Sequence, residues 1–291
     1  MGTLEVTAGA FTGEDRAAEL LRRVEQDERQ RARREQRATA LGRLAFGIGI
    51  FLAWELMSGT VLDQFFVSKP SHIAASLWAM LTTEGLLYHL RFTVVEAVTG
   101  YAIGAGTGLV LGLVLARVEF VYRIVEPFVV AFYGIPRIAL APLFILWFGI
   151  GIASKIAIAA IMVFFIVFIN TIAGIRSVPA QFVQIARVMG ASEWDLVRKI
   201  AVPAATPFII AALQITVPQA MIGAIVGEFI SSNRGVGHLI SRAAGFLDTP
   251  GLFAGIAALL VVVMLMNQAV TSLGGYLMRW SPKHGALRDV R

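Results

Sequence analysis

Six long runs of apolar residues alternate with short polar connections along the chain. A bilayer core about 30 Å thick needs about 20 apolar residues in a helix, because a backbone exposed to lipid must satisfy its own hydrogen bonds. Each of the six runs meets that length. The pattern therefore predicts an all-α integral membrane protein whose six spans lie near Leu44–Leu62, Phe92–Ala116, Pro127–Phe148, Ile156–Ile175, Pro207–Ile230 and Leu252–Leu273.

The composition agrees with lipid as the main solvent. Of the 291 residues, 57% are hydrophobic and 15% are charged, which leaves too few polar side chains to cover one large soluble core. The sequence has no cysteine, which excludes disulfides, Cys-bound zinc and thiol catalysis. We expect no metal site, because the four histidines lack the spacing of metal ligands: His72, His89, His238 and His284.

The net charge of +6 marks one side of the membrane and does not indicate a nucleic-acid partner. Residues 1–40 carry eight Arg and eight acidic residues, so the surplus lies in the short connections between the spans. With the N-terminus inside, sixteen Lys and Arg residues flank the spans on the inner side and five on the outer side. The positive-inside rule then places both termini in the cytoplasm.

The two ends of the chain differ in character from the middle. The first residues lack the apolar stretch and small-residue cleavage site of a signal peptide. Residues 1–40 are expected to form a charged cytosolic extension, helical because residues 14–37 consist mainly of strong helix formers. Residues 41–277 form the six-span domain, and residues 278–291 form a cytosolic tail.

Four glycines recur at every fourth position of the second span. Helical geometry places them on one face, where they form a groove that another helix can approach closely. We interpret the groove as a packing surface within the fold, and a seam between two copies of the chain is the alternative. The four residues are Gly100, Gly104, Gly108 and Gly112.

Polar residues inside the spans predict a polar seam through the bundle. Pro136 and Pro142 interrupt the third span, so kinks are expected there, and Arg137 lies between them. A charge at that depth usually faces a partner or an aqueous path. Glu96 and Glu228 lie near the predicted outer ends, where water can reach them. We assign the aqueous path to five residues, each of which could instead bond a neighbouring helix: Tyr133, Arg137, Asn170, Gln214 and Gln219.

The longest polar connection on the inner side, residues 177–207, is typical of two short helices separated by small residues. Ser192 is a good N-cap for the second helix. A short amphipathic helix joined to two spans is suited to insert into the groove of another protein. In the first helix, apolar residues recur at helical spacing, at Phe182, Ile185, Val188 and Met189.

This loop resembles the cytosolic signature of the permease subunits of binding-protein-dependent ABC importers. The signature has Glu-Ala-Ala, a Gly after an Arg-containing turn and a later Pro. Here Gln184 and Ile185 replace the first Glu and Ala. The resemblance assigns contact with an ATPase to Gln184, Ala186, Arg187, Gly190, Ala191, Ser192 and Pro203.

The resemblance covers most of residues 45–277 and is closest to the nitrate, sulfonate and taurine branch. It implies a six-span type I ABC importer permease fold, similar to the methionine importer permease, with a cytosolic coupling helix. Glu96 is a departure, since that branch commonly has an arginine there. The matching motifs include Trp54-Glu55-Leu56, Ile135-Pro136-Arg137, Trp147-Phe148-Gly149-Ile150-Gly151, and Glu228 followed by Gly235-Val236-Gly237.

The resemblance implies a transport subunit of the bacterial inner membrane, and not an enzyme. Its implied partners are cytosolic ABC ATPases on the loop around Gly190, an extracytoplasmic solute-binding protein and a second permease copy in a homodimer. ATP and Mg²⁺ would be bound by the ATPase, because none of the four lysines of this chain follows glycine, as a phosphate loop requires. The implied cargo is a small solute, either an anion such as nitrate, sulfonate or taurine, or a related organic compound.

An ion-coupled secondary transporter is the alternative function, with Glu96, Arg137 and Glu228 as relay groups. It is disfavoured because no part of the chain repeats convincingly with inverted topology. An intramembrane enzyme is disfavoured because the spans contain no His or Asp pair that could serve as a catalytic centre.

Overall fold

The computed structural model describes residues 13–278, so the first twelve residues of the expected extension and residues 279–291 of the expected tail lie outside the described residues. Apart from one β-bridge between Ser58 and Leu62, residues 13–278 consist of helices and loops. The chain divides into two compact units, residues 1–70 and residues 71–291.

The first unit contains α1 (Gly13–Met57) and the turn that follows it. The helix continues without a break past residue 40, where the charged segment meets the apolar segment, because no proline lies between them. Its apolar part, Arg34–Met57, is long enough to cross a bilayer and has no buried side chains. The helix ends five residues before the predicted end of the first span, and Gly59 then takes a φ of +88° in the turn.

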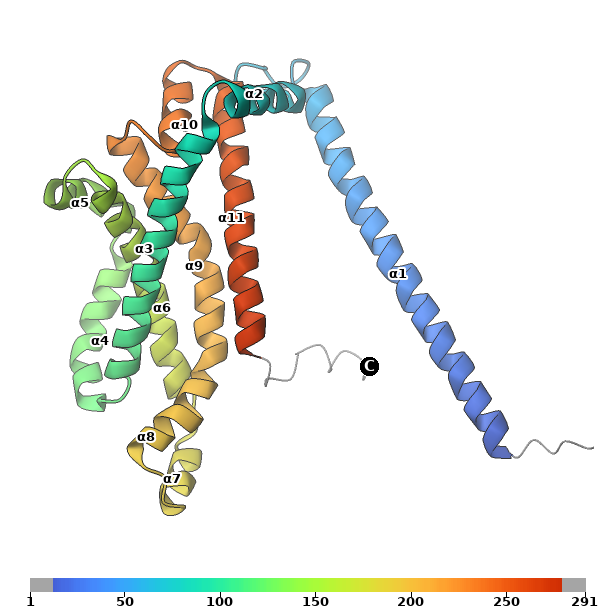
Figure 1. The fold of residues 1–291 in the computed structure, drawn as a ribbon, viewed down its shortest axis with the longest axis vertical. Helices are drawn as coiled ribbons and strands as arrows, with labels where there is room; N and C mark the ends of the chain where they lie inside the picture. Colours follow the sequence, from blue (N-terminus) through green and yellow to red (C-terminus); the bar gives the residue numbers. More distant parts are fainter. Residues whose placement is uncertain (1–12, 279–291) are drawn as a thin grey trace, which may run out of the picture. The chain divides into compact units, whose positions relative to one another are not determined.

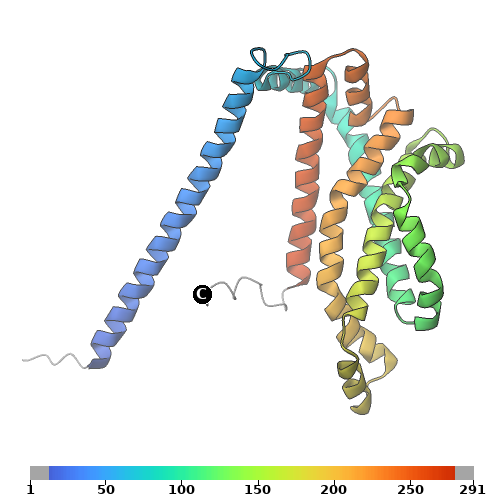
Figure 2. The ribbon, with the colours of Figure 1, turned by 180° about the vertical axis from the view of Figure 1, so that it is seen from behind.

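The second unit is a bundle of helices that run up and down between two ends (Figure 1). At one end, called the α10 end, α3 and α6 begin and α9 finishes; at the other, called the α7–α8 end, α6 finishes and α9 begins (Figures 1 and 2). Its elements are α2 (Pro70–Thr82), α3 (Leu86–Leu115), α4 (Glu119–Gly134), η1 (Arg137–Leu140), α5 (Ala141–Phe148), α6 (Ile152–Arg176), α7 (Ala180–Val188), α8 (Glu193–Leu196), η2 (Val197–Ala201), α9 (Val202–Ser231), α10 (Val236–Gly245) and α11 (Thr249–Leu277).

Membrane-length helices account for most of both units. Within residues 13–278, five helices are long and apolar enough to cross a bilayer, and the bent pair of α4 with η1 and α5 would make a sixth. The predicted six spans are therefore all represented by helices. The predicted starts of the second and fourth spans lie several residues too late, because α3 begins at Leu86 and α6 at Ile152.

The predicted third span differs most from its expected form. The two helical parts meet at an angle of 87°, at a break after Gly134. Pro136 has no N–H and follows Ile135 in extended backbone, so the helix stops where only a kink was expected. The kink predicted at Pro142 was wrong, because this proline lies in the first turn of α5, where no intrahelical donor is lost.

The core of the bundle forms where α3 packs on α6 and α6 packs on α9. A Cβ added at Gly108 would lie 2.7 Å from the carbonyl oxygen of Phe164, and one at Gly112 would lie 2.8 Å from the Cβ of Thr171. Gly100 and Gly104 face the same helix, against Ala159 and Ala160. The whole glycine groove of α3 is thus filled by α6 of the same chain, which leaves no seam there for a second copy.

Candidate functional site

The break between α7 and α8 is a glycine-dependent turn. Gly190 has a φ of +86°, a conformation that costs an L side chain energy. The Gly190 N–H donates to the carbonyl of Arg187 at 2.9 Å, and the Ala191 N–H donates to the carbonyl of Ala186 at 3.0 Å. These two bonds are those of a Schellman motif, which ends a helix by bonding its last free carbonyls.

The start of α8 is fixed by reciprocal side-chain bonds. The Ser192 hydroxyl accepts from the Asp195 N–H at 3.2 Å, and the Asp195 carboxylate accepts from the Ser192 N–H at 3.3 Å. This capping box confirms Ser192 as the predicted N-cap. Arg187 also pairs with Glu193 at 2.9 Å across the break. The turn therefore holds α7 and α8 in a defined relation.

The second half of the loop continues directly into a membrane-length helix. From Glu193 to Ser231, α8, η2 and α9 form one helical stretch of 39 residues. η2 is a π-helical turn, and Pro203 stands in the first turn of α9. Arg117, in the turn between α3 and α4, lies over the ring of Trp194 at 5.8 Å. A force on α8 would therefore act on α9 and on the α3–α4 turn.

The loop exposes apolar side chains at the α7–α8 end. Val188 and Met189 are 90% and 82% exposed, and α7 buries none of its residues. A contiguous exposed apolar patch rimmed by polar residues is typical of an interaction site. Of the predicted contact residues, Gln184, Arg187, Gly190 and Ser192 are exposed, while Ala186, Ala191 and Pro203 are half-buried. The apolar members of this surface are Phe182, Ile185, Val188, Met189 and Trp194.

A buried network joins three helices at the α10 end. The Thr93 hydroxyl donates to Oε1 of Glu228 at 2.6 Å and accepts from the Val236 N–H at 2.8 Å. The Gly237 N–H donates to Oε2 of Glu228 at 2.6 Å. Both oxygens of this 1% exposed carboxylate are therefore bonded. Gly235 and Gly237 are needed beside it because a Cβ at either position would collide with the carboxylate.

Beside this network lies a second buried carboxylate, that of Glu96. Oε1 of Glu96 lies 3.4 Å from the Lys155 ammonium, which also donates to the Ser232 hydroxyl at 2.8 Å. Glu96 is 2% exposed and Lys155 is 6% exposed. Glu96 and Glu228 were expected where water can reach them, but both side chains are buried. Lys155 precedes the predicted start of the fourth span, yet it lies in α6 and is buried too. These side chains are buried because the N-terminal parts of α3 and α6 pack closely with each other and with α9.

A cleft of about 850 Å³ opens next to these charges. Glu96, Lys155 and Glu228 form part of its wall, and residues from the end of α9 and from α10 form much of the rest. The guanidinium of Arg234 lies over the Phe92 ring at 5.1 Å, so this rim cation is held by an aromatic face. The volume is within the range of small-molecule sites.

The five residues assigned to a path do not gather in one place. The Arg137 guanidinium lies over the Tyr133 ring at 4.9 Å and donates to the Met162 carbonyl at 3.1 Å. Asn170 bonds its own helix, at the carbonyl of Ile166. The remaining two lie on α9: Gln214 reaches Thr271 of α11 at 3.4 Å, and Gln219 is half-buried.

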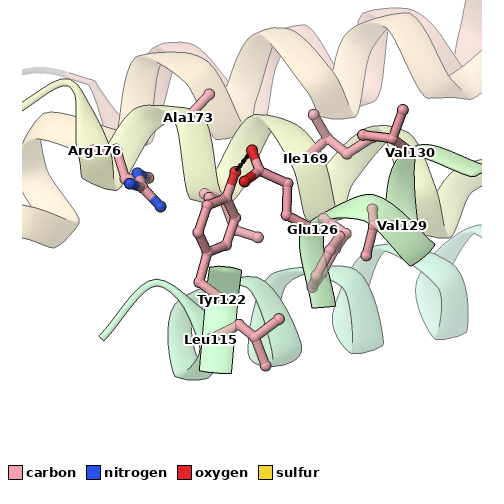
Figure 3. A pocket seen from close by; sticks show the side chains of 10 residues that line it. Leu115, Tyr122, Glu126, Val129, Val130, Ile169, Ala173 and Arg176 are labelled. Atoms are coloured by element: carbon pink, nitrogen blue, oxygen red, sulfur yellow. Dashed lines mark hydrogen bonds between the residues drawn. The ribbon is translucent and has the colours of Figure 1, made fainter. Parts of the chain in front are cut away.

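A second cavity, of about 210 Å³, lies between α4 and α6 toward the α7–α8 end (Figure 3). Its wall is mainly apolar. The Tyr122 hydroxyl donates to Glu126 at 2.6 Å, and the Arg176 guanidinium lies over the Tyr122 ring at 4.1 Å. None of the five path residues lines this cavity or the 850 Å³ cleft. The relay of the alternative function is also not assembled, because Arg137 bonds the middle of α6 and does not line the cleft with Glu96 and Glu228.

Sequence reasoning missed Lys155, Thr93 and Ser232 as members of the α10-end cluster. The position of Lys155 at the start of the most apolar span, α6, could have indicated a buried partner, because an unpaired ammonium inside a membrane is costly. Thr93 and Ser232 gave no comparable signal, because threonine and serine are common at helix ends and inside spans alike.

The comparisons with known proteins agree with this geometry. Residues 108–280 match the family described as the binding-protein-dependent transport system inner membrane component. The chain is 34% identical to the riboflavin transport system permease protein RibX of Chloroflexus aurantiacus, over 74% of this chain and 81% of that protein. It is also 34% identical to the formylaminopyrimidine transport permease protein ThiX of Halalkalibacterium halodurans, over 84% of this chain and 97% of that protein.

A solved structure supports the fold. A chain of the MetNI methionine ABC transporter, in inward-facing conformations, aligns with a TM-score of 0.52 at 22% identity, over 69% of this chain and 96% of that chain. The fold is that of a type I ABC importer permease, as predicted. The family match covers more than half of the chain, and an ion-coupled secondary transporter is not favoured. The chain is a multi-pass inner membrane transport subunit and not an enzyme, and it belongs to the binding-protein-dependent transport system inner membrane components, the permeases of ABC importers.

Proposed function

We propose that the α7–α8 loop is the coupling element through which a cytosolic ABC ATPase moves this permease. The observation that carries the proposal is the exposed apolar face of α7 and α8, held in a fixed turn by Gly190. An amphipathic helix of this kind binds by laying its apolar face into a hydrophobic groove of a partner. Gln184 and Arg187 would then form the polar rim of the contact.

Movement of the loop reaches the bundle through two connections. On one side, α7 follows α6 after a short turn; on the other, α8 continues into α9. α6 and α9 pack on one another, and α6 also packs on α3. A displacement of the loop would therefore move the bundle core as a body, which favours alternating access driven from the α7–α8 end.

The division of labour follows from the chemistry that this chain carries. ATP and Mg²⁺ would be bound by the ATPase, because the sequence lacks a phosphate loop. With the loop in the cytoplasm, both termini are cytoplasmic and the α10 end faces the extracytoplasmic solute-binding protein. The permease would act as a homodimer, with Tyr133 and Arg137, near the break between α4 and η1, among the groups along the path.

The cargo is a small organic solute. The two relatives are named for riboflavin and for formylaminopyrimidine, which differ in size while their permeases are equally identical to this chain. That equality supports a permease scaffold shared by different cargoes. It favours an organic compound over a small inorganic anion such as nitrate.

The test is to replace Gly190 with valine and to measure ATPase stimulation by the loaded solute-binding protein. A β-branched residue disfavours a φ of +86°, so the turn must change and stimulation should fall about tenfold or more. Gly275→Val is the matched control, because a side chain there meets no neighbour within 4 Å and Gly275 lies in α11. Unchanged stimulation in Gly190→Val would refute the coupling role.

A further inference from the structure

The charge of α1 is divided along its length. Residues 14–28 contain six acidic residues and three Arg, whereas residues 29–43 contain six Arg and one acidic residue, Glu35. The charges of residues 1–40 sum to zero, so the net charge hides this division. α1 is unbroken from Gly13 to Met57, and both parts therefore belong to a single helix (Figure 1). We call residues 14–28 the acidic segment and residues 29–43 the basic segment.

The basic segment lies where the helix leaves the membrane. At 1.5 Å per residue, a hydrocarbon core of about 30 Å takes about 20 residues, which reach back from Met57 to Ala38. Arg37 then lies at the edge of the core, and Arg34 and Arg31 lie about 6 Å and about 10 Å outside it. The headgroup layer is about 5–8 Å thick on each side. The field of a charged surface extends about 8 Å further at physiological ionic strength.

Three arginines of the basic segment form a row of like charge. Arg31, Arg34 and Arg37 follow one another at intervals of three residues, which makes them neighbours on the helix surface, and all three are exposed. Like charges at neighbouring positions repel one another and destabilise an isolated helix. Glu35 lies one turn beyond Arg31 and can offset only that end of the row. The row is therefore complementary to a surface that carries several negative charges.

The rule that orients membrane spans does not account for this division. It counts Lys and Arg and is nearly indifferent to acidic residues. It would be satisfied equally if the acidic residues of α1 were mixed among the arginines. Their separation from the membrane edge indicates that the charge of the basic segment itself is used.

We propose that the basic segment of α1 binds anionic phospholipid headgroups at the membrane surface from which it emerges. Guanidinium groups bind phosphate oxygens through two parallel N–H···O bonds. A cluster of four or more basic residues directly beside a span is typical of binding to anionic lipid. The same surface repels the acidic segment, so residues 13–28 project about 24 Å away from the bilayer and do not lie along it. This binding needs neither ATP nor the loop around Gly190, so it is independent of the coupling role.

The experiment measures lipid selectivity by electron paramagnetic resonance. The transporter, with its ATPase, is placed in phosphatidylcholine vesicles that contain a trace of nitroxide-labelled phosphatidylglycerol or nitroxide-labelled phosphatidylcholine, and the fraction of label immobilised at the protein is compared. We expect phosphatidylglycerol to be preferred at low ionic strength. The preference should fall in about 1 M salt, where the Debye length is about 3 Å. A wild-type preference that is absent or insensitive to salt would overturn the proposal without the use of any variant.

Variants then locate the site. The combined variant Arg31→Gln, Arg34→Gln and Arg37→Gln removes the row and should reduce the preference for phosphatidylglycerol at least about twofold. The matched control removes the same number of charges from the acidic segment of the same helix, more than about 20 Å from the core edge, and should leave the preference unchanged. The control substitutions are Arg16→Gln, Arg22→Gln and Arg23→Gln.

Three results would overturn the assignment. An unchanged preference in the variant of the row would show that the lipid binds elsewhere. Equal losses in the two variants would show that net charge matters and its place does not. An unchanged preference together with loss of the ATPase on copurification would show that the row binds protein and not lipid.

Discussion

The two ends of the bundle place charged and apolar groups in opposite ways. At the α10 end, Glu96, Lys155 and Glu228 are buried and are bonded to polar groups of the protein. At the α7–α8 end, charged residues pair on the surface, as Arg187 does with Glu193, while Val188 and Met189 face outward. Buried charges hold the first end together from within. The second end keeps its apolar surface for a partner.

This contrast separates residues that stabilise the permease from residues that connect it to other proteins. A buried ionic network that loses one member leaves the others without partners, so its loss acts on folding. An exposed apolar residue contributes little to the stability of the isolated chain, so its loss acts on assembly. Substitutions at the two ends should therefore give different combinations of stability and activity.

The largest effect on stability is expected for Glu228→Ala. Thr93 and the Gly237 N–H would be left without their buried acceptor, and the free energy of unfolding should fall by about 3–5 kcal/mol. Unfolding in detergent, followed by circular dichroism, measures this. Glu193→Ala, a change at a carboxylate that is 79% exposed, is the control and should change stability by about 0.5 kcal/mol or less. Equal losses in the two variants would remove the distinction between the ends.

A smaller effect is expected in the glycine groove between the two ends. Gly108→Leu places a side chain against the backbone of α6, and overpacking of this kind costs about 1–3 kcal/mol. Gly106→Leu, on the same helix, meets open space and provides the control. The measurement compares the unfolding midpoints of the two variants in detergent. If Gly106→Leu is as destabilising as Gly108→Leu, close approach of α3 to α6 is not what the glycines provide.

The smallest effect is expected for Ser192→Ala. Loss of the N-cap hydroxyl should cost about 1 kcal/mol, and the cost should fall on α8 because the bonds of the cap are local. Hydrogen exchange should therefore become faster at residues 193–196 and remain unchanged at the α10 end. Faster exchange throughout the bundle would contradict the local character of the loop.

The sequence predicted the spans well because their apolar runs carry the signal over about twenty residues each. It also predicted the face formed by Gly100 and Gly108, though not that α6 would fill it, since many helices can occupy a groove of small residues. The α10-end cluster could not be assembled in advance. Thr93 and Glu228 are 135 positions apart, and only the packing of α3 on α9 brings them together. The two prolines of the third span show the same limit. Both interrupt one apolar run in the sequence, but only Pro136 follows the end of a helix, whereas Pro142 lies in the first turn of α5.

The π-helical turn η2 contains one residue more than an α-helix of the same rise needs. Such a turn absorbs an inserted residue locally, so the helix beyond it keeps its rotation. The connection between α8 and α9 can therefore differ in length by one residue without turning a different face of α9 toward α6. In this chain, the π-helical turn thus separates the position of the loop from the helix packing that forms the membrane core.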